Sequence, residues 1–168
     1  MTTMTPLARV AAPSDADAIA RIYNEGIEDR VATFETQPRT AADIASWFGG
    51  RHPVVVVEDN GQVLGFAATS TYRPRACYDG IAEFSVYVSR SARGRHVGTI
   101  AMQALFEEAR KLGFWKLISR VFPENTPSLK LLERLGFREV GTYHRHGKLD
   151  GKWRDVVIVE KLLDDDDG

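Results

Sequence analysis

The chain has 168 residues, of which 22 are lysine or arginine and 23 are aspartate or glutamate, so its formal net charge at pH 7 is −1. A chain of this length can bury the core of one domain without disulfides or metals. The near-neutral charge argues against the strongly basic surface of a nucleic-acid-binding protein, and the single Cys77 excludes an internal disulfide.

The composition also bears on location and domain organisation. The first seven residues lack a charged segment followed by an apolar one, and no apolar run approaches the ~20 residues that cross a bilayer. We expect a cytoplasmic protein with no membrane partner and no nucleic-acid partner. One domain is expected over residues 1–163, and the aspartates of residues 164–168 predict a disordered acidic tail because like charges repel.

The N-terminal part predicts a strand followed by two helices. Leu7–Ala11 is the strand, and Ser14 or Asp15 is expected to cap a helix with an apolar stripe formed by Ala18, Ile19, Ile22, Tyr23 and Ile27. Thr40 predicts the start of a shorter helix that ends at Gly49-Gly50 and carries Ile44, Trp47 and Phe48.

A hairpin follows these helices. Val54–Glu58 and Val63–Thr71 are rich in apolar, strand-forming residues, and Asn60-Gly61 lies between them. A type I′ turn needs positive φ at both central residues, and Asn-Gly is the pair that adopts it most readily. The segment therefore predicts two antiparallel strands.

The stretch Glu83–Gly98 predicts a strand, a basic turn that contains glycine and the start of a helix. The helix extends to just before Gly113 because apolar residues recur at helical spacing, and a strand over Trp115–Phe122 completes a βαβ unit. Backbone N–H groups at a helix start have no intrahelical partners and suit a pyrophosphate. Arg93 and Arg95 add positive charge to this turn.

The C-terminal third predicts one more helix and a long hairpin. Asn125–Ser128 begins the helix and Gly136 ends it, with one apolar face formed by Leu129, Leu132 and Leu135. Phe137–His146 and Trp153–Leu162 are the hairpin strands. The fold class is therefore α/β, a mixed sheet of about seven strands with four helices.

Four segments in this order resemble the GCN5-related N-acetyltransferase (GNAT) superfamily, and most closely its phosphinothricin, methionine sulfoximine and arsinothricin acetyltransferase-like branch. They are Ile22-Tyr23-Asn24 with Ala32-Thr33-Phe34-Glu35, Tyr72-Arg73-Pro74-Arg75-Ala76-Cys77-Tyr78, Glu83-Phe84-Ser85-Val86-Tyr87-Val88, and Glu124-Asn125-Thr126-Pro127-Ser128 through Gly136-Phe137. The resemblance covers nearly the whole chain. It implies a twisted, mostly antiparallel GNAT sheet that splays at its centre, and a homodimer.

The resemblance also implies an acetyl-CoA site. In such a site the pantetheine arm lies in the central splay, and the turn before the next helix binds the pyrophosphate. Leu132 stands where this branch has a histidine, and His96 stands where the phosphate motif usually has glycine. The implied cofactor-binding residues are Val86, Tyr87, Val88, Arg93, Gly94, Arg95, His96, Val97, Gly98, Thr99, Asn125 and Ser128.

The implied reaction is direct acetyl transfer to an amine. A free α-amino group has a pKa of about 8, so a base must remove a proton before or during attack on the thioester. The resemblance places Glu83 as this base, acting directly or through water. A main-chain N–H near Val86 or Tyr87 is the expected oxyanion donor, and no covalent acyl-enzyme is needed because coenzyme A is a good leaving thiol.

Arg73 and Arg75 are two residues apart, which places them on one side of an extended segment. Guanidinium groups bind carboxylates and phosphinates bidentately, so this pair suits an amino acid with an acidic side group. The resemblance gives the pair the same role, with Phe34, Tyr78 and Ser85 around the substrate. The predicted function is acetylation of the α-amino group of a small acidic amino acid or toxic analogue.

Two other functions stay open from the sequence. The enzyme could acetylate a polyamine, an antibiotic or a protein N-terminus, although a cationic substrate would be repelled by Arg73 and Arg75. Alternatively, the chain could be a non-catalytic acyl-CoA sensor. No metal is expected, because His144 and His146 lack a nearby third ligand in the sequence. A dinucleotide site is excluded because the full glycine triplet is absent.

Overall fold

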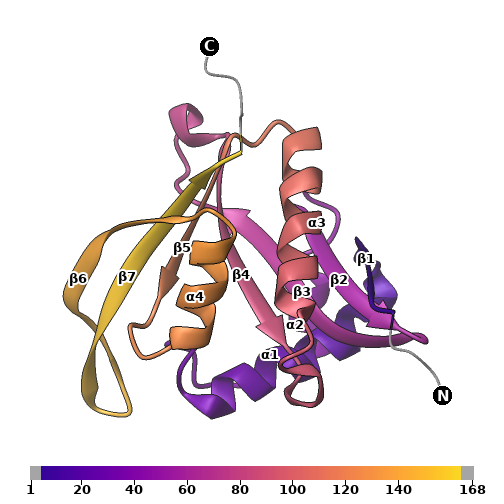
Figure 1. Ribbon diagram of the computed structural model, residues 1–168, viewed down its shortest axis with the longest axis horizontal. Coiled ribbons are helices and arrows are strands. Elements are labelled where there is room, and N and C mark those ends of the chain that lie inside the picture. The colour runs from indigo at the N-terminus through magenta and orange to yellow at the C-terminus, as the bar shows by residue number, and fades with distance from the viewer. Residues whose placement is uncertain (1–4, 164–168) are drawn as a thin grey trace.

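The computed structural model describes residues 5–163, and in this range one mixed sheet forms the centre of the molecule (Figure 1). Its seven strands have the order β1-β2-β3-β4-β5-β7-β6, and every neighbouring pair is antiparallel except β4 and β5. The strands are β1 (Leu7–Val10), β2 (Val54–Asp59), β3 (Gln62–Thr71), β4 (Ile81–Val88), β5 (Lys116–Val121), β6 (Arg138–Leu149) and β7 (Lys152–Leu162). The predicted strand number and mixed character are confirmed, and the predicted acidic tail lies outside the described residues.

Helices cover both faces of the sheet (Figure 1). The α-helices are α1 (Ala16–Asp29), α2 (Ala41–Ala45), α3 (Val97–Lys111) and α4 (Thr126–Arg134), and the 3-10 turns are η1 (Pro13–Asp15), η2 (Ala76–Tyr78) and η3 (Arg90–Ala92). Alternate side chains of β2 point to opposite faces, as strand geometry requires. Val54 and Val56 belong to the core cluster of α1 and α2, whereas Val55 and Val57 belong to the cluster of α3 and α4.

The predicted β2–β3 hairpin is confirmed. Asn60 and Gly61 have φ values of 52° and 79°, which is the left-handed conformation that the two central residues of a type I′ turn require. The predicted βαβ unit is also confirmed, because α3 connects β4 to the parallel strand β5.

The sheet opens between β4 and β5. Their parallel ladder pairs only Ile81–Glu83 with Lys116–Ile118, although β4 continues to Val88. Figure 1 shows the two strands diverging beyond this ladder. At the point of divergence, the Ser119 hydroxyl donates to the Phe84 carbonyl oxygen at 2.8 Å. Backbone groups of β4 beyond Phe84 therefore face a gap in the ladder, which is the central splay that the sequence resemblance implies.

The second helix is shorter than predicted. Thr40 caps it as expected, since its hydroxyl accepts a hydrogen bond from the Asp43 N–H, but the helix ends at Ala45 instead of reaching Gly49-Gly50. Beyond Ala45 the chain forms turns that direct the Trp47 ring toward Tyr23 and Phe66. The helix thus ends before the glycine pair, and the Trp47 ring packs on the core cluster of α1 and α2.

The expected side-chain cap of α1 is wrong. Asp15 occupies the N-cap position, but its carboxylate makes no cap hydrogen bond to the helix. It accepts hydrogen bonds from both Arg9 amino groups, at 2.7 and 2.9 Å, and from the Ala12 N–H. Arg9 also contacts Glu58 at 3.1 Å. The carboxylate thus ties β1 to the start of α1, and the contact with Arg9 holds its pKa below the ordinary value.

Asp15→Asn is expected to lower the free energy of unfolding by about 1–2 kcal/mol at neutral pH, because the largely buried ion pair with the half-exposed Arg9 is lost. The folded-state pKa of Asp15 lies below its ordinary 3.8, so this contribution is complete above 3.8 and is lost as the pH falls through the folded-state pKa. Urea denaturation at several pH values should show the difference from wild type narrowing below 3.8. The exposed Asp17→Asn is the control, and an equal, pH-independent loss in both variants would contradict this account.

Among residues 5–163, no helix is long and apolar enough to cross a membrane. Within the same range, no group of three or more histidine, cysteine, aspartate or glutamate side chains has the arrangement of a metal site.

Candidate active site

Two cavities lie on either side of β4, and Ala32 and Tyr87 line both of them. The first, which we call the Glu83 cavity, has a volume of about 710 Å³. The second, which we call the α3 cavity, has a volume of about 680 Å³ and adjoins the start of α3. Each is large enough for a small-molecule ligand.

The Glu83 cavity contains three of the residues predicted to bind substrate, namely Phe34, Glu83 and Ser85. Its other side chains come from α1, from the α1–α2 connection, from the segment after α2, from strands β3, β5 and β7, and from the residue that follows β5. They include Tyr23, Glu35, Trp47, His52, Ser70, Thr71, Ser119, Arg120, Phe122 and Val156. The cavity therefore combines an aromatic wall with a polar edge along the sheet.

Glu83 lies between two arginines. Its Oε2 is 3.2 Å from Nη2 of Arg120, and its Oε1 is 4.0 Å from Nη1 of Arg73. The Glu83 side chain is 24% exposed, so it is partly shielded and still reachable from the cavity. It also stands at the end of the β4–β5 ladder, opposite Ile118. A carboxylate in this place can accept a proton from an amine that enters the Glu83 cavity.

The remaining predicted substrate residues lie outside the described lining of this cavity. β3 ends at Thr71, and the chain then turns into η2, so the extended segment expected to carry Arg73 and Arg75 is broken. Arg73 reaches Glu83 from this loop and stacks on Tyr72, and Tyr72 in turn contacts Tyr78 edge-on. The substrate role of Arg73, Arg75 and Tyr78 stays a prediction.

Phe34 forms the wall opposite the sheet. Its ring contacts Phe122 edge-on with centroids 4.8 Å apart. Gly147 of β6 provides the space on the other side, because a Cβ there would lie 2.8 Å from the Phe34 ring. The segment that carries Phe34 is anchored to α1, since the Asn24 side chain bonds both the N–H and the carbonyl of Arg39. The terminal hairpin and α1 together position this wall.

The α3 cavity contains eleven of the twelve residues predicted to bind the cofactor. They are Val86, Tyr87, Val88, Arg93, Gly94, His96, Val97, Gly98, Thr99, Asn125 and Ser128. Arg95, the twelfth, lies in the same turn but is not among the described lining residues. Lys130 and Arg134 of α4, which the sequence did not single out, add two cations to this cavity.

The turn before α3 has the conformation that presents helix N–H groups. Gly94 and His96 have φ values of 80° and 62°, and His96 is the N-cap of α3. A left-handed residue other than glycine costs roughly 1–2 kcal/mol, which explains why glycine is usual at the position of His96. On the neighbouring helix, the Asn125 side-chain oxygen accepts a hydrogen bond from the Ser128 N–H at 3.4 Å.

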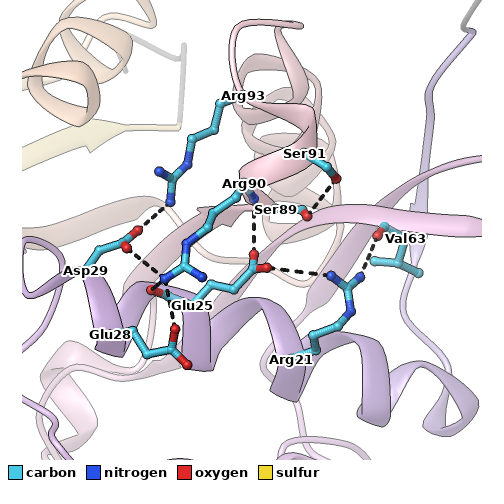
Figure 2. A network of polar contacts seen from close by, with 9 residues as sticks. All are labelled: Arg21, Glu25, Glu28, Asp29, Val63, Ser89, Arg90, Ser91 and Arg93. Carbon is cyan, nitrogen blue, oxygen red and sulfur yellow. Dashed lines mark hydrogen bonds and ion pairs between the residues drawn. The ribbon is translucent and has the colours of Figure 1, made fainter.

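An ionic network fixes this turn to the end of α1 (Figure 2). Arg90 contacts Glu28 at 3.0 Å and Asp29 at 2.9 Å, and its N–H donates to Glu25. Arg93 contacts the other oxygen of Asp29 at 2.6 Å. Burial raises the pKa of Asp29, but the hydrogen bonds from Arg93 and Arg90 outweigh it, so the pKa lies below its ordinary value. One wall of the α3 cavity therefore carries the ion pair of Arg93 and Asp29.

Tyr87 separates the two cavities. Its ring packs on Phe66 and Tyr23, and it lies against Gly26 of α1, where a Cβ would come within 2.6 Å of the ring. Burial raises the pKa of Tyr87 far above its usual range, so the phenol stays protonated at neutral pH. The backbone of Tyr87 belongs to the part of β4 beyond the ladder, where an acyl group could be bound.

Among the polar residues of the Glu83 cavity that sequence reasoning missed are His52 and Arg120. His52 follows α2 and lies against Phe114; burial lowers its pKa below 6.5, so the imidazole is neutral at pH 7. Arg120 lies on β5 next to Glu83 only because of the parallel β4–β5 register. A local pattern does not reveal that register. Leu132, at the position where the branch has histidine, is buried in the core of α3 and α4.

A carboxylate cavity and a groove with helix N–H groups and cations meet at an opening in the sheet. This arrangement defines an enzyme that transfers a group from a phosphate-bearing carrier to a small acceptor. Residues 19–137 match the model of the acetyltransferase (GNAT) family. The chain belongs to this family and is an N-acetyltransferase.

The relatives and solved structures agree with this assignment. YwnH of Bacillus subtilis, provisionally named a phosphinothricin acetyltransferase, is 36% identical over 92% of this chain and 98% of its own length. The L-methionine sulfoximine/L-methionine sulfone acetyltransferase of Pseudomonas paraeruginosa is 32% identical, with 96% of both chains covered. A phosphinothricin acetyltransferase from Sinorhizobium meliloti in complex with acetyl-CoA has a TM-score of 0.87 at 32% identity, covering 96% of this chain and 89% of that chain. The predicted GNAT fold and the resemblance to this branch are confirmed.

Proposed function

We propose that this enzyme transfers the acetyl group of acetyl-CoA to the α-amino group of a small acidic amino acid or a toxic analogue of one. The candidate substrates are phosphinothricin, methionine sulfoximine, methionine sulfone and arsinothricin. The observation that carries the proposal is the position of Glu83, which ends the β4–β5 ladder and faces a cavity next to the α3 cavity. The relatives named as a methionine sulfoximine/methionine sulfone acetyltransferase and as a phosphinothricin acetyltransferase support the same substrate class.

In this proposal acetyl-CoA occupies the α3 cavity. The pyrophosphate lies at the turn of Gly94 and His96, where helix N–H groups and nearby cations favour an anion. The pantetheine arm follows β4 beyond the ladder, so that the thioester reaches the Glu83 cavity near Tyr87. The solved complexes of relatives with acetyl-CoA support this occupant.

The chemistry needs one base and one oxyanion donor. The amine nitrogen attacks the thioester carbonyl carbon and loses a proton to Glu83, the carbon–sulfur bond breaks, and the thiolate of coenzyme A leaves. The negative charge that develops on the carbonyl oxygen is stabilised by a backbone N–H of β4 near Val86 or Tyr87. No covalent enzyme intermediate forms.

A homodimer stays a prediction. The side chains of Tyr143 and Trp153 in the terminal hairpin are exposed, and a second copy of the chain would cover them.

A thiol-release assay with acetyl-CoA and a panel of amines tests the substrate class. We expect turnover of phosphinothricin, methionine sulfoximine and methionine sulfone. Turnover of a polyamine should be much weaker, since Arg120 and Arg73 flank Glu83 and repel the remaining positive charges of a polyamine. Identification of the product by mass spectrometry should place the acetyl group on the α-nitrogen. Turnover of polyamines alone would contradict the amino-acid substrate.

A further inference from the structure

Arg120 has a position in the Glu83 cavity that no other cation shares. Of the described residues that line this cavity, Arg120 is the one lysine or arginine. Two carboxylates, Glu35 and Glu83, line the same space, and His52 is neutral at pH 7 because burial lowers its pKa. Among the described lining residues, Arg120 is therefore the cation with which an anionic group in the cavity can form an ion pair.

The contact between Arg120 and Glu83 limits what the arginine can bind. Nη2 of Arg120 lies 3.2 Å from Oε2 of Glu83, and a guanidinium has five N–H donors, so this contact leaves donors for a second acceptor. A group bound to Arg120 must then lie beside the atom that gives its proton to Glu83. In an α-amino acid the carboxylate and the amine are attached to the same carbon, which matches this adjacency.

Arg120 is also held in place by the sheet. Its backbone pairs with Ile158 of β7, and the preceding Ser119 is hydrogen-bonded to Phe84 across the opening. Arg73 approaches Glu83 from the other side, but from a loop and at 4.0 Å. Of these two arginines, Arg120 starts from a backbone fixed in the sheet and makes the shorter contact with Glu83, so its guanidinium is the better placed for a carboxylate beside Glu83.

From these contacts we infer that Arg120 binds the α-carboxylate of the substrate and so makes the enzyme select free α-amino acids over their amides and over simple amines. The inference rests on the proposed function. It assigns the carboxylate to Arg120 on β5, and it leaves Arg73 as a contact for the acidic side group.

The test compares methionine sulfone with its carboxamide, which keeps the amine and the side chain but lacks the carboxylate. The wild-type enzyme is expected to have a kcat/KM about 10- to 100-fold higher for the acid. Arg120→Met should abolish most of this preference by raising KM for the acid. Because Arg120 also contacts Glu83, its loss acts on the base with both substrates, so the readout is the ratio of the two kcat/KM values. Arg120→Lys should restore part of the preference, because it keeps the charge without the guanidinium geometry.

Arg73→Met is the matched variant, because it also removes an arginine that contacts the Glu83 carboxylate. It should keep the preference for the acid over the amide. If Arg120→Met kept that preference, Arg120 would be only a partner of Glu83 and the inference would be wrong. If the wild-type enzyme acetylated the amide as well as the acid, the inference would fail while the proposed acetyltransferase activity stood. If it acetylated neither compound nor any other α-amino acid, both would fail.

Discussion

Glu83→Gln is expected to lower kcat by about 10²- to 10⁴-fold, the usual contribution of a general base. Glutamine keeps the size of the side chain and one acceptor oxygen but cannot accept a proton at neutral pH. The dissociation constant of acetyl-CoA, measured by calorimetry, should stay within about twofold, because Glu83 does not line the α3 cavity within the described residues. The loss should shrink at high pH, where more of the amine is already neutral.

The exposed Glu107→Gln on α3 controls for the loss of one carboxylate and should leave kcat unchanged. Melting temperatures of the two variants and the wild type show whether the fold is intact. A kcat of Glu83→Gln equal to that of wild type from about pH 6 to 9 would remove Glu83 as the base.

Gly65→Ala is the second change with a large expected effect. A Cβ at Gly65 would lie 2.7 Å from Cγ1 of Val97, the first residue of α3, and 2.9 Å from the Tyr87 carbonyl oxygen on β4. Gly65 lies on β3, so the added methyl must push α3 and β4 away from β3, at a cost of about 1–3 kcal/mol in the free energy of unfolding. Because both elements line the α3 cavity, the dissociation constant of acetyl-CoA should rise about tenfold.

Gly141→Ala is the matched control for Gly65→Ala. Gly141 also lies in a strand, has no positive φ, and has no heavy atom within 4 Å of the position of an added Cβ. Urea denaturation and calorimetry should give wild-type values for it. Equal effects of the two substitutions would show that the close approach of β3, β4 and α3 at Gly65 is not what positions the cofactor site.

Elements set by short-range chemistry were predictable from the sequence. Asn60-Gly61 determines its own turn through positive φ, and Asn125 with Ser128 marks the start of α4. The strand–turn–helix of Glu83–Gly98 was recognisable for the same reason, since the periodicity changes where the strand gives way to the helix. Nine of the twenty described residues that line the α3 cavity belong to this one segment, which is why most of the residues predicted to bind the cofactor lie together.

Features set by packing between distant segments were not predictable. Asp15 was expected to cap α1, but Arg9 and Ala12 compete successfully for its carboxylate. Arg120 enters the Glu83 cavity through the register of two parallel strands joined by a crossover helix, and no local pattern encodes that register. The turn after Thr71 moves Arg75 off the strand because the chain folds into η2. The residues predicted to bind substrate therefore lie partly apart in the structure, whereas those predicted to bind the cofactor lie around one cavity, and the roles of both sets stay predictions.

In the proposed mechanism, the acetyl group is transferred at the opening between β4 and β5. A crystal structure with acetyl-CoA is the decisive experiment. We expect a pyrophosphate at the turn of Gly94 and His96, a pantetheine arm along β4 beyond the ladder, and a thioester facing the Glu83 cavity. A cofactor bound elsewhere, or a thioester that does not enter the Glu83 cavity, would contradict this mechanism.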